Sequence, residues 1–498
     1  MTLSSNPPRL SNQTLGQLPA DVVRPSYDRK GLATGLVHLG LGAFHRAHQA
    51  FYTEQVLNAG DLRWGIAGAS LRAADTRDAL APQDGLYTLA VRDTAQTAYQ
   101  VIGALTGLSV APENPSALIK VMAQDSVKIV SLTVTEKGYC HDPATGDLND
   151  DHPDIRHDLL HPDQPKSVLG FLLAALSERK RLGHAPFAVL TCDNLPANGH
   201  TLQKVMLQFT ALARKDLLSF VTNEVAFPST MVDRIVPSTT DADRAWITQT
   251  LGVEDAWPIM TEPFTQWVIE DHFPQGRPDW GAYGAELVRD VLPYETMKLR
   301  LLNGSHSTLA YLGYLSGYET VADAMSDPAL AHLIEDMMAD EITPVLTLPH
   351  GADVAAYRRS LLARFRNTAL RHRTWQIAMD GSQKLPQRLL STIRERLAVQ
   401  APIDRLALGV AAWMRYVTGM DEKGQPIDVR DPLAAALRAR ADQSGLQADK
   451  LAPALLGMEA IFGKDLPAQP IFVGAVTHAL DQLIRNGAKA TVAGMKRK

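Results

Sequence analysis

Two hydrophobic patterns divide the chain. Before residue 290, short β-rich apolar runs alternate with stretches of helical periodicity. Such alternation is typical of βαβ units around a largely parallel sheet. Between residues 87 and 110, β-like segments follow one another without a good helix, which predicts an antiparallel addition. The expected strands are residues 36–40, 64–71, 87–92, 128–135, 187–192 and 224–231, and the expected helices include 45–57, 168–179 and 202–213.

After residue 290 the periodicity is almost entirely helical. Helices are expected at residues 295–312, 328–341, 354–365, 385–399, 406–417, 432–441, 451–458 and 473–486. The chain therefore divides into an α/β domain, residues 1–290, and a mainly α-helical domain, residues 291–498. Residues 1–30 are polar and proline-bearing, and we expect an arm with little regular structure.

Composition narrows the class of protein. At 498 residues the chain is too long for one compact core. The net charge of −5 offers no basic excess for nucleic acid. The two cysteines, Cys140 and Cys192, form no metal-ligand pattern and fit a reducing cytoplasm. No apolar run approaches the ~20 residues that cross a bilayer, and residues 1–30 contain no apolar core of a secretory signal.

The stretch K-L-R-L-L-N-G-S-H, residues 298–306, places chemistry on a helix face that should be buried. At about 100° per residue, with Lys298 at zero, His306 lies near 80° and Asn303 near 140°, among leucines. Each alone is ordinarily a snorkelling or satisfied core residue. Together they supply a base, an amide donor and an orienting imidazole, and burial would make the amine a usable base near neutral pH.

A glycine-rich turn follows the first expected strand. Gly40 and Gly42 provide the tight turn and close approach that a pyrophosphate needs, although His45 replaces the third glycine of the fingerprint. A plain βα turn is the alternative interpretation. On the first interpretation, the fold class expected is a Rossmann-type dinucleotide-binding domain followed by a helical substrate and catalytic domain. Asp75 could hold the coenzyme ribose and Arg72 could tolerate a 2′-phosphate, so NAD is favoured and NADP stays open. The candidate coenzyme residues in the turn are Gly40, Gly42, Phe44, His45 and Arg46.

Further polar residues follow the expected strands. Glu136, Asn194 and Asp233 come directly after apolar runs, at the strand ends where open α/β sheets bind ligands. Ordinary loop or capping roles are equally compatible with them. Arg371, Arg373 and Lys384 lie in a later stretch suited to sugar hydroxyls or a carboxylate, whose plain interpretation is a solvated helix end.

At several of these motifs the sequence resembles the polyol-specific long-chain dehydrogenases, the mannitol dehydrogenase family. The matching stretches are HLGLGAFHRAHQA, TVTEKGY, CDNLPANG, FPSTMVDRIVP and KLRLLNGSHS. The stretches EPFTQWVIED, GRPDW, RHRTWQIAMDGSQKLPQR and GVAAWMRY are most similar to the hexuronate-pathway branch. The resemblance extends from about residue 37 nearly to the C-terminus.

The resemblance implies a zinc-independent, NAD-dependent reaction with no metal site. Lys298 would be the general acid or base, and Asn194 and Asn303 would form an oxyanion hole. His306 would orient Lys298 and the substrate, and Glu136 would lie near the proton path. Asp233 would contact the nicotinamide side, Gly40 and Gly42 the pyrophosphate, and Lys384 the substrate.

The resemblance also implies a substrate and two alternatives. The expected reaction is reversible reduction of D-fructuronate to D-mannonate by a cytoplasmic monomer without nucleic-acid or membrane partners. A substrate carboxylate would be held by Arg371, Arg373, Lys384 or Arg388, most strongly in a bidentate pair. A mannitol or other polyol 2-dehydrogenase is the alternative within the family. A catalytically silent metabolite-binding protein is the alternative outside enzymes.

Overall fold

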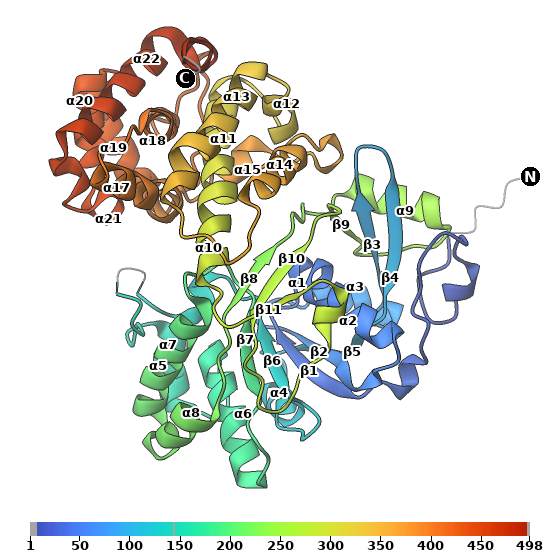
Figure 1. Ribbon diagram of the computed structural model, residues 1–498. Coiled ribbons are helices and arrows are strands. Elements are labelled where there is room, and N and C mark those ends of the chain that lie inside the picture. Colours follow the sequence, from blue (N-terminus) through green and yellow to red (C-terminus); the bar gives the residue numbers. More distant parts are fainter. Residues whose placement is uncertain (1–6, 143–144, 496–498) are drawn as a thin grey trace, which may run out of the picture. The chain divides into compact units, whose positions relative to one another are not determined.

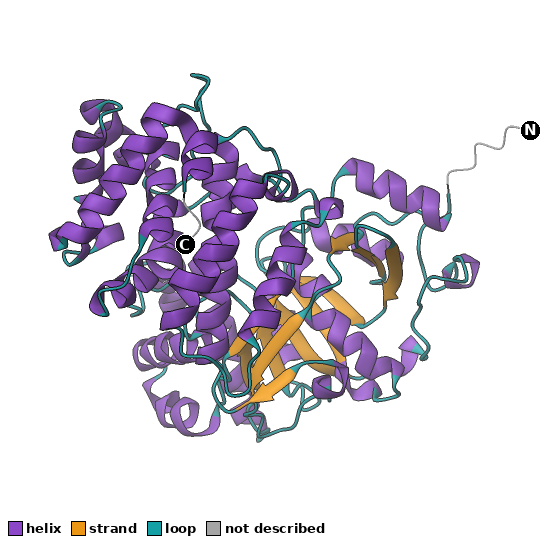
Figure 2. Ribbon diagram, turned by 45° about the horizontal axis from the view of Figure 1, so that its top comes forward, coloured by secondary structure: helices purple, strands orange, loops and turns teal. Residues whose placement is uncertain are grey.

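The computed structural model describes residues 7–142 and 145–495. It contains two compact units, Met1–Leu292 and Pro293–Lys498 (Figure 1). The first carries the strands and the second is helical (Figure 2). This confirms the predicted fold class, an α/β domain with a largely parallel sheet followed by a helical domain.

The first unit is built on a five-stranded parallel sheet with strand order β5-β2-β1-β6-β7. Its central strand β1 pairs with β2 on one side and β6 on the other, so the strand order reverses there. Ligands bind at such switch points in open α/β sheets. The strands are β1 (Thr34–Leu39), β2 (Gly65–Ser70), β5 (Leu105–Val110), β6 (Ile129–Leu132) and β7 (Ala188–Thr191).

Both faces of this sheet are covered. On β1, Leu36 joins a buried cluster with Tyr52, whereas Val37 joins the cluster of Phe171. Continuous burial of successive residues is what a covered parallel strand requires. The helices of this unit are α1 (Ala43–Ala47), α2 (Gln49–Asn58), α3 (Asp75–Leu80), α4 (Pro115–Met122), α5 (Pro153–Leu160), α6 (Val168–Leu182), α7 (Asn198–Ala213), α8 (Leu218–Glu224) and α9 (Asp241–Leu251).

Local sequence explains where these helices begin and end. The Ser167 hydroxyl accepts from Gly170 N and caps α6, which ends at Gly183 in the left-handed conformation. Thr240 and Asp243 form a reciprocal capping box at α9. The single helix expected over residues 45–57 is instead two helices, because the backbone leaves helical geometry at His48.

Two smaller sheets complete the first unit. One has the order β4-β3-β9 and the other β11-β10-β8. The β3–β4 hairpin confirms the antiparallel addition, whereas β5 pairs in parallel with β2. The strand expected over 224–231 was wrong in position, because Glu224 ends α8. The strands are β3 (Tyr87–Arg92), β4 (Thr97–Ile102), β8 (Thr230–Asp233), β9 (Ile259–Thr261), β10 (Gln266–Glu270) and β11 (Glu286–Val288).

Residues 7–30 contain two short 3₁₀ turns, Leu15–Gln17 and Arg29–Gly31. The segment is anchored to the α/β unit, since Leu10 N donates to Glu254 O and Val23 N donates to Tyr99 O. The first part of the expected arm, residues 1–6, lies outside the described residues.

The second unit has a helical core in which α11 packs on α15 and α18, and α18 packs on α22. Its described residues form helices and loops without a β-strand. The helices are α10 (Leu292–Lys298), α11 (Ser305–Leu315), α12 (Val321–Met325), α13 (Pro328–Asp336), α14 (Val354–Phe365), α15 (Thr374–Ala378), α16 (Gly381–Leu385), α17 (Ser391–Ala398), α18 (Asp404–Tyr416), α19 (Ala434–Ser444), α20 (Ala448–Leu456), α21 (Glu459–Phe462) and α22 (Pro470–Gly494).

Three π-helical turns interrupt this unit, at Leu299–Gly304, Met337–Ile342 and Pro386–Leu390. The first packs against the other two. The regular helix expected over residues 295–312 is therefore three segments. At Gly304, an added Cβ would lie 2.7 Å from the carbonyl oxygen of Arg388, so glycine permits this close approach. Single π turns inside helices are frequent at functional sites.

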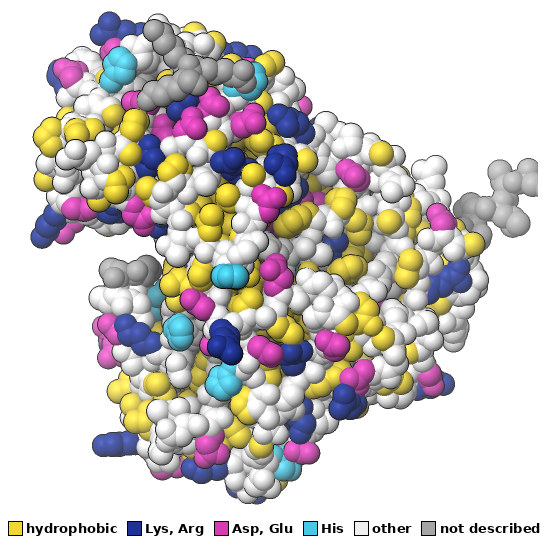
Figure 3. All heavy atoms as spheres, in the orientation of Figure 1, with side chains coloured by type: hydrophobic (Ala, Val, Ile, Leu, Met, Phe, Trp, Pro, Cys, Tyr) yellow, Lys and Arg dark blue, Asp and Glu magenta, His cyan; other side chains and the backbone are white. Residues whose placement is uncertain are grey.

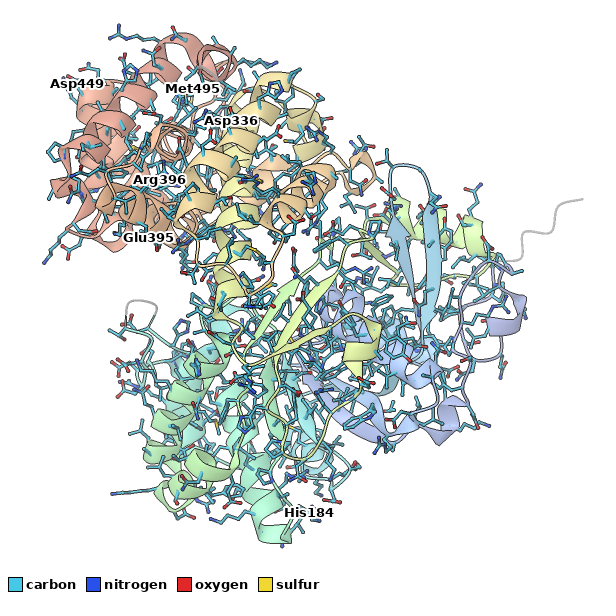
Figure 4. All side chains as sticks on the ribbon, viewed as in Figure 1. His184, Asp336, Glu395, Arg396, Asp449 and Met495 are labelled. Atoms are coloured by element: carbon cyan, nitrogen blue, oxygen red, sulfur yellow. The ribbon has the colours of Figure 1, made fainter. Side chains whose placement is uncertain are left out.

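An ion pair joins the first π turn to α17. The Arg300 Nη2 group donates to Glu395 Oε1 of α17 at 2.6 Å, and Glu395 is labelled in Figure 4. On the face in view in Figure 3, acidic and basic side chains are interspersed. Among the described residues, the helices are too short or too polar to cross a membrane.

Candidate active site

The turn after β1 depends on glycine. Gly40 has φ of +95°, and an added Cβ would lie 2.1 Å from the carbonyl oxygen of Thr133 at the end of β6. Gly40 N donates to Ala69 O, and Gly42 N donates to Gly40 O at 2.7 Å. Gly42 is the N-cap of α1 without a side chain to fill the cap. The backbone is thus fixed where the strand order reverses.

A cavity of about 300 Å³ opens beside this turn. Gly40, Gly42 and Thr133 line it together with Arg72 and Asp75, which follow β2. Arg72 and Asp75 are both exposed. Three of the predicted coenzyme residues therefore share one cavity at the carboxyl ends of β1, β2 and β6.

The other residues of the turn are placed differently. Phe44 is half-buried and stacks on His48. His45 and Arg46 are buried beneath the turn. The Arg46 guanidinium donates to Trp257 O at 2.9 Å, and burial lowers its pKa to about 10. Both side chains support the turn from the core side.

Buried side chains position the loops after β6 and β7. The Asp193 carboxylate accepts from Val134 N, Thr135 N and the Tyr139 hydroxyl. Burial raises the pKa of Asp193, and these hydrogen bonds oppose the rise. The Asp193 bonds join the loop that carries Glu136 to the loop that carries Asn194.

The Asn198 amide fixes the second loop further. It donates to Thr230 O at 2.8 Å and accepts from Thr230 N at 2.9 Å. Glu136 and Asn194 are exposed at this edge, whereas Asp233 is buried at the end of β8. The sequence predicts Asn198 only as a turn residue, and its side-chain hydrogen bonds to the Thr230 main chain were not predicted.

In the helical unit, Lys298 ends α10, Asn303 lies in the π turn and His306 is in the first turn of α11. Lys298 and His306 are buried and Asn303 is half-buried. Among the residues that the structure describes, Asn303 Oδ1 and His306 Nε2 are buried without a hydrogen-bond partner. A buried polar atom left unpaired costs about 1–3 kcal/mol, so both atoms are suited to receive a ligand.

Cationic and aromatic groups surround His306. Its ring stacks on Phe365 at 5.2 Å between centroids and meets His372 edge-on at 4.9 Å. Burial lowers the pKa of His306 well below its usual value, and the charges of His372, Arg388, Arg364 and Lys384 lower it further. His306 is therefore neutral near pH 7.

Arg388 approaches this face from the third π turn. Its Nη1 donates to Ser307 Oγ at 3.0 Å and lies 3.5 Å from Asn303 O. Lys384 on α16 donates from Nζ to Met379 O at 2.5 Å and to Ile377 O at 3.3 Å. Arg371 and Arg373 are exposed, and Arg373 lies 3.7 Å from Glu319. The structure thus brings Arg388 and Lys384, but not these two arginines, into the surroundings of His306.

His372 is the main residue that sequence analysis missed. It lies between the two predicted arginines, and burial lowers its pKa to about 4. Arg371 takes the left-handed conformation, with φ of +44°, so the backbone at this point is irregular. No helical periodicity could show which of the three neighbouring side chains points inward.

Within residues 7–142 and 145–495, no group of three or more His, Cys, Asp or Glu side chains is arranged to hold a metal ion.

The first unit has a glycine turn at the switch point of a parallel sheet, and the helical unit has buried Lys298 and His306 with half-buried Asn303. These features are typical of a nucleotide-dependent oxidoreductase. The chain belongs to the mannitol dehydrogenase family. Residues 34–282 match the mannitol dehydrogenase Rossmann domain, and residues 290–484 match the mannitol dehydrogenase C-terminal domain.

Several relatives cover nearly the whole chain. The D-mannonate oxidoreductase of Escherichia coli K12 is 47% identical over 95% of this chain and 98% of its own length. The uncharacterised oxidoreductase YeiQ of the same organism is also 47% identical, over 95% of this chain and 96% of its own. A solved Pseudomonas fluorescens mannitol 2-dehydrogenase, in complex with NAD and D-mannitol, is 40% identical, with a TM-score of 0.90 over 97% of this chain and 99% of its own.

Proposed function

We propose that the chain is an NAD-dependent fructuronate reductase that interconverts D-fructuronate and D-mannonate. The observation that carries the proposal is the positive charge around the buried face of Lys298, Asn303 and His306. Arg388, Arg364 and Lys384 all act on His306. A neutral polyol gains little from such surroundings, whereas a uronate brings a carboxylate. The 47% identity to the E. coli D-mannonate oxidoreductase supports the same substrate.

The coenzyme proposal is supported by the cavity beside the glycine turn. Gly40 and Gly42 allow close approach of a pyrophosphate, and Asp75 can accept hydrogen bonds from ribose hydroxyls. The relative solved with NAD matches both units of this chain. Bound NADH supplies the hydride that reduces the substrate carbonyl carbon.

Side chains of the protein then stabilise the charge on the substrate oxygen and transfer its proton. Lys298 donates a proton to the substrate oxygen during reduction and accepts one during oxidation. Asn194 and Asn303 hold the developing alkoxide, and Glu136 passes the proton to solvent. Neutral His306 orients Lys298 and a substrate hydroxyl through its buried Nε2.

We assign the substrate carboxylate to Arg388. One edge of its guanidinium is fixed by Ser307 and Asn303, so the group is held next to the reacting face. A guanidinium can bind a carboxylate through two parallel hydrogen bonds. The ammonium of Lys384 is held by two main-chain carbonyls, and we give it a supporting charge.

The test is the initial rate of NADH oxidation with D-fructuronate, beside D-fructose and beside NADPH. Turnover of D-fructuronate with NADH supports the proposal. Turnover of D-fructose alone would contradict it and favour a polyol 2-dehydrogenase, for which the 40% identity to the mannitol 2-dehydrogenase speaks. Silence with both substrates, despite NADH binding, would favour a metabolite-binding protein.

An Arg388→Gln variant tests the carboxylate contact. Loss of one charged hydrogen-bonding pair should raise the KM for D-fructuronate about 10- to 100-fold. The matched control is Arg373→Gln, which removes an exposed guanidinium and should leave this KM within about twofold. Equal effects of the two variants would contradict the assignment.

We further propose a cytoplasmic monomer. The buried, unpaired Cys140 and Cys192 fit a reducing compartment, and the monomeric state rests on the family resemblance.

A further inference from the structure

A chain of buried hydrogen bonds lies under the glycine turn. His38 on β1 is fully buried; its Nδ1 is 2.8 Å from Ser131 Oγ and its Nε2 is 2.8 Å from Thr133 Oγ1. The Thr133 hydroxyl lies 2.7 Å from Gly40 O, and the Ser131 hydroxyl lies 2.7 Å from the side-chain amide of Gln49. The chain therefore runs from Gln49 to the carbonyl of Gly40.

The position of His38 fixes its tautomer. Besides Thr133, its Nε2 faces the carbonyl oxygen of Gly40 at 3.3 Å. A lone pair there would repel that oxygen, so Nε2 carries the proton and Nδ1 accepts. The Ser131 hydroxyl must then donate to Nδ1, and the Thr133 hydroxyl donates to Gly40.

The number of available protons determines the orientation of the Gln49 side-chain amide. Four hydrogen bonds join Gln49, Ser131, His38, Thr133 and Gly40, and they need four protons. A neutral imidazole and two hydroxyls supply three, so the fourth must come from the Gln49 amide. Its nitrogen therefore faces Ser131. In the opposite orientation that nitrogen has no hydrogen-bond partner among the described residues, so the turned amide also removes a buried unsatisfied donor.

The surroundings of His38 favour the neutral ring that this chain requires. The ring stacks on His45 with centroids 3.5 Å apart. Burial lowers the pKa of His38 to about 3, and the hydrogen bond with the Gly40 carbonyl opposes this only in part. All four hydrogen bonds thus point in one direction, toward the glycine turn.

We propose that His38 is a positioning residue for the coenzyme: held as the Nε2–H tautomer, it directs the Thr133 hydroxyl onto the Gly40 carbonyl and so sets the turn that meets the pyrophosphate. Gly40 and Thr133 both line the 300 Å³ cavity. The inference rests on the proposed coenzyme site and goes beyond the fingerprint, because His38 shapes the turn without lining the cavity.

The experiment measures the dissociation constant of NADH by fluorescence titration on the full chain. Thr133→Val removes the hydroxyl at constant shape and should weaken NADH binding about five- to tenfold. Thr133→Ser keeps the hydroxyl and should stay within about twofold of wild type.

A matched control is Thr210→Val in α7. Thr210 is buried whereas Thr133 is half-buried, and the Thr210 hydroxyl likewise donates to a carbonyl, Met206 O, at 2.7 Å. This variant loses the same kind of bond away from the cavity, so it should lower Tm as Thr133→Val does but leave NADH binding intact. A Thr133→Val enzyme that binds NADH as tightly as Thr210→Val would overturn the proposal.

A second pair acts at the ring. His38→Phe keeps the stack on His45 but removes the donor, whereas His38→Gln keeps a donor near Nε2. We expect weaker NADH binding in the first and rescue in the second; equal binding in both would overturn the role of His38. If His38→Phe does not fold, the Thr133 pair decides. Wild type that binds NADH without reducing D-fructuronate refutes only the proposed substrate.

Discussion

In the sheet unit, the candidate residues are fixed by hydrogen bonds that the unit supplies itself. Asp193 and Asn198 staple the loops after β6 and β7, and Thr133 bonds to Gly40. In the helical unit, Asn303 Oδ1 and His306 Nε2 are buried without hydrogen-bond partners among the described residues. The loops at the sheet edge are therefore held by satisfied hydrogen bonds, whereas the helical candidate site presents two side-chain atoms whose partners must come with the ligand. This difference matches a division between holding a coenzyme and doing chemistry on a substrate.

The largest expected effect is at Lys298. Lys298→Ala removes the proposed acid and base, and kcat should fall about 10³-fold. The dissociation constant of NADH should stay within about twofold of wild type. Steady-state kinetics and fluorescence titration check the two parts separately. Weaker NADH binding with normal kcat would reverse the proposed division of labour.

Substitution of one asparagine in each unit tests the comparison between the two units most directly. Asn303→Leu should lower kcat about 10²- to 10³-fold by removing an oxyanion donor. It should not lower the free energy of unfolding, because it deletes an unsatisfied atom. Asn198→Leu deletes a satisfied amide and should cost about 2–3 kcal/mol in urea unfolding. Equal stability losses in both variants would contradict the contrast between the units.

Substitution of two glycines with similar backbone angles distinguishes the cost of a positive φ from the cost of a steric clash with a neighbouring carbonyl. Gly40 and Gly60 have φ of +95° and +101°, but an added Cβ meets Thr133 O only at Gly40, and nothing within 4 Å at Gly60. Gly60→Ala should cost about 1 kcal/mol from its backbone angle. Gly40→Ala should cost at least about 2 kcal/mol more and also weaken NADH binding. Urea unfolding that gives equal values for both would show that the contact is not tight.

At neutral pH the smallest effect is at His372, because its contribution appears only as the pH falls. Its pKa is lowered to about 4 by burial and by Lys384. The unfolded state thus takes up its proton first, so the stabilisation is complete above pH ~6.5 and is lost as the pH falls toward ~4. As the pH falls through this window, the free energy of unfolding of His372→Gln should rise relative to that of wild type by at most about 1.4 kcal/mol per pH unit. A stability difference that does not change with pH would contradict a buried neutral His372.

Sequence analysis located four of the five parallel strands, because each is a short apolar run followed by polar residues, but it assigned β5 to the antiparallel addition. It also predicted the burial of Lys298 and His306, whereas Asn303 is half-buried. It missed the π turns, because these depend on tertiary contacts, such as the approach of Arg388 O to Gly304, that no local periodicity records. It missed His372 and the chain through His38 for a similar reason: their partners are distant in sequence. The predicted roles of Asn194, Glu136 and Asp233 stay predictions.

The central claim, that the Lys298 amine moves the proton, is tested most directly by chemical rescue. The rate of NADH oxidation with D-fructuronate is measured for Lys298→Ala while small primary amines are added at constant ionic strength. The account predicts that turnover rises with amine concentration and depends on the amine pKa, with no such gain in Asn303→Leu. Turnover of Lys298→Ala that matches wild type without any amine would contradict it.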